Sequence, residues 1–117
     1  MSGPTRFRDG SPWESVAGYS RGARRGGRIA VSGTTAHGAD GSALHPGDTY
    51  AQTRLALERV VEAVEELGGD RHDMVRTRLL LAPEADWEEA ARAHADVLGD
   101  VAPANTTLYV GGLIGED

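Results

Sequence analysis

Apolar residues recur at helical spacing over residues 48–67. They lie on one side of the predicted helix, and mainly glutamates lie on the other. The apolar side consists of Leu57, Val60, Val61, Val64 and Leu67. Asp48 or Thr49 can cap the first turn, and Thr49 with Gln52 has the capping-box spacing. The glycine pair at 68–69 is typical of a helix end, so we predict a helix over 48–67.

A second segment with helical spacing covers residues 86–98. Its apolar side consists of Trp87, Ala90, Ala91, His94, Val97 and Leu98. Asp86 can cap the first turn, with Glu89 three positions later. Gly99 follows the last periodic residue, and the pattern therefore predicts a helix over 86–98.

The segment before the first helix has the pattern of a β-hairpin. Residues 19–25 and 28–33 flank Gly26-Gly27, a dipeptide whose tolerance of positive φ suits a two-residue turn. Residues 1–16 are rich in turn formers and hold at most one short strand, near Phe7. We therefore predict a hairpin over 19–33.

Two further strands alternate with the helices. Residues 74–82 alternate in polarity and then become continuously apolar, which suits a central strand, and residues 105–110 follow Pro103 as the last strand. The order predicts a two-layer α/β domain over 1–117, with one mixed sheet and both helices on one face. Since nothing is left to cover the other face, the pattern favours oligomerisation.

Composition narrows the chemistry. The chain of 117 residues has a net charge of −6, no cysteine, and twelve basic residues that are all arginine. It therefore has no thiolate, no Schiff-base lysine and no Cys-based metal site. The acidic balance is unfavourable for nucleic acid, and without an 18-residue apolar run or a signal-peptide pattern we expect a cytoplasmic protein with no membrane span.

Two local features have more than one interpretation. Arg21, Arg24, Arg25 and Arg28 form either a nucleic-acid patch or a solvated sheet edge; because only Tyr19 lies near as an aromatic partner, the sequence favours the edge. The four histidines lack metal-site spacing. His94, on the apolar side of its helix, is either a hydrogen-bonded core residue, the commoner case, or a catalytic group.

Four segments carry a family resemblance in their order and spacing: "GYSRGARRGGRIAVSGTT", "YAQTRLALERVVEAVEELGG", "VRTRLLLAPEADWEEAARAHADVLGD" and "PANTTLYV". Together they resemble the Rid family of reactive intermediate deaminases, also called YjgF-like proteins, over about residues 18–110. The resemblance implies a chorismate-mutase-like α/β fold and a homotrimer around a central barrel, with small-molecule sites in the clefts between subunits. It also implies hydrolysis of enamines and imines such as 2-aminoacrylate, with water as nucleophile and neither cofactor nor metal.

The resemblance also implies a set of substrate-binding residues. Tyr19 matches the Tyr of the family's "PYSQA" segment, and Ser32 with Gly33 matches the strand end "VSGQ". A strand end bearing a glycine lets backbone amides approach a ligand, although the segment "VSGTT" is by itself also consistent with an ordinary turn. Trp87 matches an aromatic residue that covers the cleft.

The last two matches show a departure from the family. Asn105 stands where the family's "PARS" segment has the arginine that grips the substrate carboxylate, and Thr107 matches a small residue beside it. A partly buried carboxylate that loses its charged partner loses roughly 2–5 kcal/mol of binding energy. An amide still donates a hydrogen bond, which suits a neutral carbonyl, and Arg21 is the candidate for a substitute cation.

A second departure is at the end of the sequence. The family continues with a further strand, whose Glu helps to position the water, and we expect that strand after Asp117. These features support a Rid-like enamine or imine hydrolase with altered substrate choice. A non-catalytic trimeric binder or sensor is the alternative, and a ribonuclease is a weaker one. No residue is assigned as catalytic.

Overall fold

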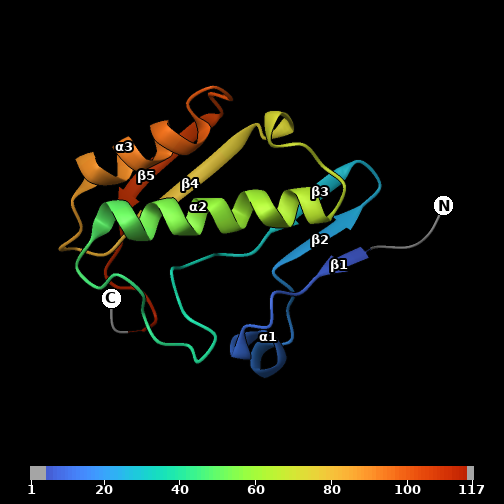
Figure 1. Cartoon of the computed structure of the whole chain (residues 1–117), viewed down its shortest axis with the longest axis horizontal. Coiled ribbons are helices and arrows are strands. Elements are labelled where there is room, and N and C mark those ends of the chain that lie inside the picture. The colour runs from blue at the N-terminus through green and yellow to red at the C-terminus, as the bar shows by residue number, and fades with distance from the viewer. Residues whose placement is uncertain (1–4, 116–117) are drawn as a thin grey trace.

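The computed structural model describes residues 5–115, and Figure 1 shows its elements in order. They are β1 (Thr5–Phe7), α1 (Pro12–Ala17), β2 (Gly22–Arg25), β3 (Arg28–Val31), α2 (Thr49–Glu66), a short 3₁₀ turn η1 (Arg71–Asp73), β4 (Arg76–Leu81), α3 (Trp87–Leu98) and β5 (Ala104–Tyr109). Both predicted helices and all strands predicted within these residues are present. The further strand expected after Asp117 lies outside the described residues.

The strands form two sheets. β1, β2 and β3 are antiparallel, with Arg25 opposite Arg28 at the hairpin turn, whereas β4 and β5 are parallel. The prediction of one mixed sheet is therefore wrong for the described residues, since no ladder there joins β3 to β4. A groove of about 1740 Å³ separates these two strands and is lined also by α2. An alternating pattern defines a strand but not its lateral neighbour, so the sequence did not show this separation.

α2 and α3 pack side by side on one face of the strands, as predicted (Figure 1). The Tyr50 hydroxyl of α2 donates to Asp96 of α3 at 2.5 Å, and the Arg92 guanidinium lies 3.9 Å from the centre of the Tyr50 ring. The buried apolar residues of the two helices and their ends are Leu57, Ala63, Val64, Leu67, Ala90, Ala93 and Leu98. The predicted apolar sides are thus largely confirmed, but Trp87 and Ala91 are exposed and Ala63 and Ala93 are additional core residues.

The start of α2 differs in one detail from the prediction. Asp48 is the cap, and its carboxylate accepts from Ala51 N at 2.9 Å. Thr49 does not form the predicted capping box, because its hydroxyl accepts from Asp86 N at 3.1 Å and so connects the first turns of α2 and α3. Gln52 donates from its side-chain amide to the Leu44 carbonyl. The tertiary contact between the helices therefore replaces the local one.

α1 was not predicted, because its six residues are too short to show helical periodicity. Ser11 caps it, accepting from Trp13 N. Its residue Glu14 is buried, and the carboxylate accepts from the backbone N–H groups of Asp9, Gly10 and Arg21. This single carboxylate ties the loop after β1 to the start of β2, and the three hydrogen bonds compensate for its burial.

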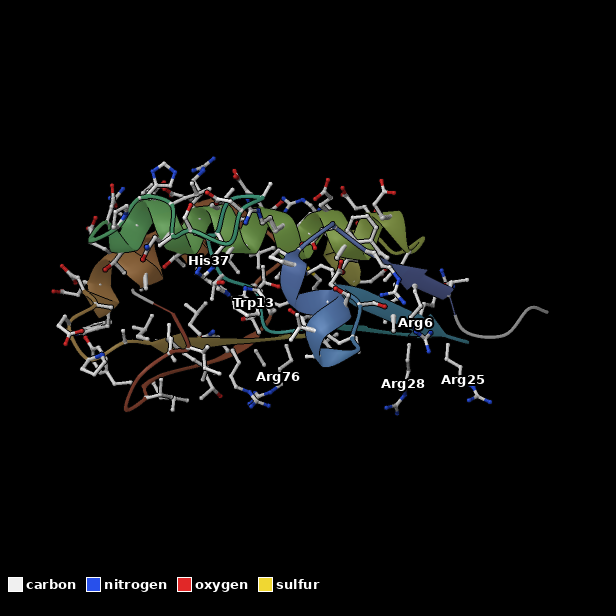
Figure 2. The ribbon with its side chains drawn as sticks, turned by 90° about the horizontal axis from the view of Figure 1, so that it is seen from below. Arg6, Trp13, Arg25, Arg28, His37 and Arg76 are labelled. Atoms are coloured by element: carbon white, nitrogen blue, oxygen red, sulfur yellow. The ribbon has the colours of Figure 1, made fainter. Side chains whose placement is uncertain are left out.

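The arginine cluster divides into two pairs. Arg21 is buried, and Arg24 donates to the Leu67 carbonyl at 2.8 Å, which satisfies an end group of α2. Arg25 and Arg28 are exposed and point away from α2 (Figure 2). The prediction of a solvated edge is correct for Arg25 and Arg28 and wrong for Arg21, because the packing of α1 and the 32–34 segment encloses it.

The face of the strands opposite the helices is open. Arg76 points away from the helices in Figure 2, and the strand residues Leu80 and Leu108 are 46% and 40% exposed. In the described part of the chain no helix covers this face, as the sequence predicted. Within the same residues, no helix combines the length and the apolar character that a membrane crossing requires.

Candidate functional site

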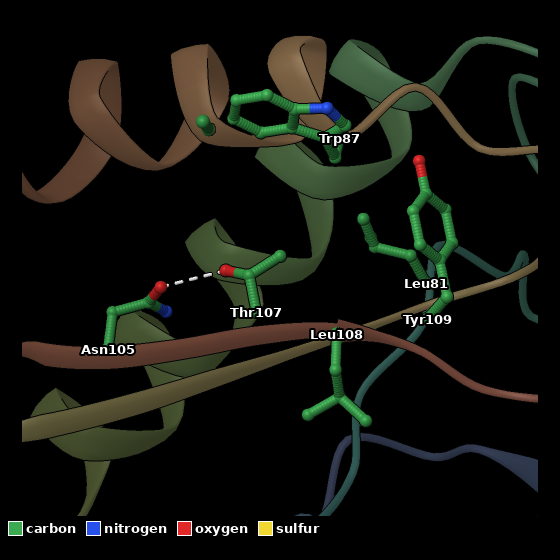
Figure 3. A pocket seen from close by; sticks show the side chains of 7 residues that line it. Leu81, Trp87, Asn105, Thr107, Leu108 and Tyr109 are labelled. Atoms are coloured by element: carbon green, nitrogen blue, oxygen red, sulfur yellow. Dashed lines mark hydrogen bonds between the residues drawn. The ribbon is translucent and has the colours of Figure 1, made fainter.

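A cleft of about 400 Å³ lies between α3 and β5 (Figure 3). Its lining comprises Leu81, Trp87, Ala91, Asn105, Thr107, Leu108 and Tyr109. The volume is within the range of small-molecule sites. None of these seven residues is an arginine, a histidine or a carboxylate, so the described cleft is polar without carrying a formal charge.

Strand alternation places the polar groups. Asn105, Thr107 and Tyr109 are two residues apart on β5 and extend to the side of α3, whereas Leu108 extends to the opposite side (Figure 3). Asp86 caps α3 by accepting from Glu88 N and Glu89 N, and the helix start brings Trp87 over the cleft. The Tyr109 hydroxyl donates to the Ala85 carbonyl at 2.7 Å, which holds its ring at the cleft's edge.

A chain of hydrogen bonds leads from the cleft into the protein. The Thr107 hydroxyl donates to Asn105 Oδ1 at 2.7 Å (Figure 3), and Asn105 Nδ2 donates to Thr77 Oγ1 at 3.1 Å. Thr77 Oγ1 is 2.8 Å from His94 Nε2. Burial lowers the pKa of His94, because the charged imidazolium is less well solvated there. His94 is therefore a hydrogen-bonded residue of the layer between α3 and the strands.

The structure brings together three of the six predicted binding residues: Trp87, Asn105 and Thr107. Tyr19, Ser32 and Gly33 are not part of this cleft. Ser32 and Gly33 line the groove between β3 and β4, and Tyr19 lies beside Arg21, whose guanidinium is 5.6 Å from the centre of its ring. Within one subunit the predicted set thus forms two separate groups.

Arg21, the candidate substitute for the family's arginine, belongs to the second group. Its Nε donates to Asp9 Oδ2 at 2.9 Å, and its Nη1 donates to the Gly33 carbonyl and the Thr34 hydroxyl. Burial would raise the pKa of Asp9, but hydrogen bonds from Ser11 and Arg21 and the charge of Arg21 together lower it. The Arg21 guanidinium is thus bound within its own subunit and does not line the cleft of Asn105.

Sequence reasoning missed Thr77 and Tyr109. Thr77 is a buried hydroxyl, 8% exposed, between Arg76 and Arg78 on β4. A polar residue on the helix-facing side of an otherwise apolar strand is the signal that could have identified it, because such a hydroxyl needs a partner. Nothing in the sequence distinguishes Tyr109 from an ordinary strand aromatic residue.

Comparisons with known proteins agree with this arrangement. The family model described as Endoribonuclease L-PSP matches residues 10–116. The uncharacterized protein SCO2049 of Streptomyces coelicolor is 39% identical over 109 residues, which cover 93% of this chain and 81% of that protein.

Solved structures extend the similarity to the fold. Rv2704 of Mycobacterium tuberculosis, a member of the YjgF/YER057c/UK114 family, is 36% identical with a TM-score of 0.83, covering 96% of this chain and 88% of that one. PA3499 of Pseudomonas aeruginosa, described as a protein of unknown function, is 28% identical with a TM-score of 0.79, covering 97% and 84%. The chain therefore belongs to the Endoribonuclease L-PSP family, which is the YjgF or Rid family.

Proposed function

We propose that this protein hydrolyses reactive enamines or imines whose recognised group is neutral. The observation that carries the proposal is the cleft around Asn105, a built site that combines an amide, a hydroxyl and two aromatic residues without a cation. A substrate carboxylate would find no charged partner there. A neutral carbonyl would accept from the Asn105 amide at little cost in solvation.

The chemistry needs few groups. Water adds to the carbon of the C=N bond, the nitrogen takes up protons, and ammonia leaves as the carbonyl forms. Asn105 and Thr107 would orient the substrate, while Trp87 and Tyr109 would limit the access of bulk water. The described cleft lining holds no side chain suited to general acid–base catalysis at neutral pH, and we assign no catalytic residue.

The complete site is proposed to form between subunits. In a homotrimer that covers the helix-free face, the group of Tyr19, Ser32 and Gly33 from one subunit would approach the Asn105 cleft of the next. Two observations support this: the predicted residues fall into two groups within one subunit, and Leu80 and Leu108 are exposed on the open face. The mass of the assembly in solution tests the trimer directly.

The test of activity is ammonia release from imines generated in situ, with 2-aminoacrylate as the carboxylate substrate and its carboxamide analogue as the neutral one. The wild-type protein should act on the carboxamide and be slow with the carboxylate. Asn105→Arg should reverse the preference, because it restores a charged partner. Equal rates for both substrates in both proteins would refute the proposed role of Asn105.

A non-catalytic binder is the second candidate, and the same lack of an acid–base pair in the described lining favours it. A carboxamide that raises the melting temperature without being consumed would identify a binder, because a ligand of the native state stabilises it. Turnover of the same compound would identify an enzyme. The variant Arg25→Ala, at an exposed position that does not line the cleft, serves as a control in both assays.

A further inference from the structure

Four side chains form one line of hydrogen bonds from the cleft to a buried imidazole: Thr107, Asn105, Thr77 and His94. Such a line has a direction, because each hydroxyl has a single proton to donate. The direction decides which atoms of Asn105 and Thr107 remain for a ligand. An inference from this direction rests on the proposed function, since it names what the same cleft recognises.

The direction is fixed at Thr77. Its hydroxyl is buried, and its hydrogen-bond partners among the described residues are Asn105 Nδ2 and His94 Nε2. An amide nitrogen donates and does not accept, so it cannot take the Thr77 proton. A buried hydroxyl proton without an acceptor is costly. The Thr77 proton therefore points to Nε2 of His94, which must be the unprotonated nitrogen of a neutral ring.

The rest of the line is determined from this end. The Thr77 oxygen acts as an acceptor toward Asn105, so the amide turns its nitrogen to Thr77 and its carbonyl to Thr107. The single proton of Thr107 is then committed to the Asn105 carbonyl. Toward the cleft there remain the second N–H of Asn105, which donates, and the lone pairs of the Thr107 oxygen, which accept.

We propose that His94, acting through Thr77, is a positioning residue that sets this direction and makes the cleft select a carboxamide-like group over a carboxylate. A carboxamide offers its carbonyl to the Asn105 N–H and its own N–H to Thr107, which makes two hydrogen bonds. A carboxylate has no proton to give. It would make one hydrogen bond and would place its second oxygen against the lone pairs of Thr107.

A reversed line predicts the opposite preference. If His94 carried its proton on Nε2, the Thr77 hydroxyl would be free to donate to Asn105. The amide would then turn over, and the Thr107 proton would be released toward the cleft. Both groups facing the ligand could then serve an acceptor-only group such as a carboxylate.

The first measurement is the tautomer of His94, read from the ¹⁵N chemical shifts of its ring in labelled full-length protein at pH 7.5. We expect Nε2 to be unprotonated and Nδ1 to carry the proton. A protonated Nε2 overturns the inference, whether or not the protein proves to be a hydrolase. The outcome of this measurement is independent of any activity assay.

The second measurement compares benzamide with benzoate, which have the same ring and differ in the recognised group. Binding is followed by the side-chain amide signals of Asn105 and the indole signal of Trp87. We expect benzamide to bind about tenfold more tightly or better, the ratio that one hydrogen bond of about 1.4 kcal/mol provides. Equal binding, tighter binding of benzoate, or binding of neither probe overturns the proposed selectivity.

Matched variants separate positioning from folding. His94→Gln keeps an acceptor near the position of Nε2 and should retain the preference for benzamide, whereas His94→Phe removes the acceptor and should reduce it to within about threefold. Thr77→Ser and Thr77→Val form the same kind of pair. Each variant is first shown to unfold cooperatively. Retention of the full preference in folded His94→Phe and Thr77→Val overturns the role of the line.

Discussion

The Nε atom of Arg21 donates to Asp9 Oδ2 at 2.9 Å, and the two side chains are 7% and 25% exposed. Asp9 lies in the loop after β1, and Arg21 lies directly before β2. The same guanidinium donates to the Gly33 carbonyl. One arginine therefore fixes the N-terminal loop and the end of the hairpin relative to each other, at the place where the family resemblance locates Tyr19, Ser32 and Gly33.

Replacement of this arginine should destabilise the fold. Arg21→Met keeps much of the apolar stem but leaves Asp9 and the Gly33 carbonyl without their donor. We expect the free energy of unfolding to fall by about 3 kcal/mol, in the range for one partner of a largely buried pair. Urea denaturation measures this change. Arg25→Met, at an exposed position of the same hairpin, should cost no more than about 0.5 kcal/mol. A similar cost for both variants would show that the Asp9 contact is energetically neutral.

Two glycines should respond differently to alanine. A Cβ at Gly69 would lie 2.8 Å from Ile29 Cδ1, 3.0 Å from Val64 Cγ1 and 3.2 Å from the Val64 carbonyl oxygen. Since the carbonyl belongs to the backbone of α2, the strain is not relieved by a side-chain rotation. We expect Gly69→Ala to cost about 1–3 kcal/mol.

Gly27 at the hairpin turn is the matched control, because a Cβ at this position would extend into open space. Gly27→Ala should be neutral or stabilise by up to about 1 kcal/mol. Thermal unfolding of the two variants side by side makes the comparison. A loss of stability for Gly27→Ala as large as that for Gly69→Ala would contradict the steric explanation.

Removal of the α3 cap should affect both stability and the cleft. In Asp86→Ala the N–H groups of Glu88 and Glu89 lose their acceptor, and we expect a loss of about 1 kcal/mol. Because Trp87 is the next residue, its fluorescence should also change in the folded variant. Glu84→Ala, an exposed change two residues earlier, should alter neither measurement appreciably. An unchanged unfolding midpoint for Asp86→Ala would exclude the cap as a source of stability.

His94 should make stability depend on pH in the mildly acidic range. Burial lowers its pKa in the folded protein below the ordinary value of 6.5, so the unfolded chain binds a proton first as the pH falls. The contribution of the neutral ring is fully present above about pH 6.5 and is lost as the pH falls through that value toward the folded pKa. Urea midpoints between pH 8 and pH 5 follow this loss.

His94→Phe cannot take up this proton, so its stability should change less over the same interval, even though its stability at pH 8 is lower. An equally steep decrease in both proteins would place the titrating group elsewhere. The nearest alternative of known direction is Asp9, whose pKa is lowered and whose contribution is lost only below about pH 4. The two ranges do not overlap.

The sequence by itself determined the helices and strands. Periodicity and end signals located α2 and α3 to within a residue or two, because the apolar positions and the caps are local properties. The alternation of β5 likewise placed Asn105 and Thr107 on one side of a strand. Together with the order of the segments, these local signals were enough to indicate the family.

Only the tertiary structure decided how these elements meet. The sequence could not show that β3 and β4 remain apart, that Arg21 is buried, or that Thr77 connects Asn105 to His94, because each depends on residues distant along the chain. The partners of a buried polar group are chosen by packing, since burial makes an unpaired group costly while leaving open which neighbour satisfies it. The local pattern therefore supplied the chemical groups of the cleft, and the packing of α3 on β4 and β5 gave them their hydrogen-bond partners.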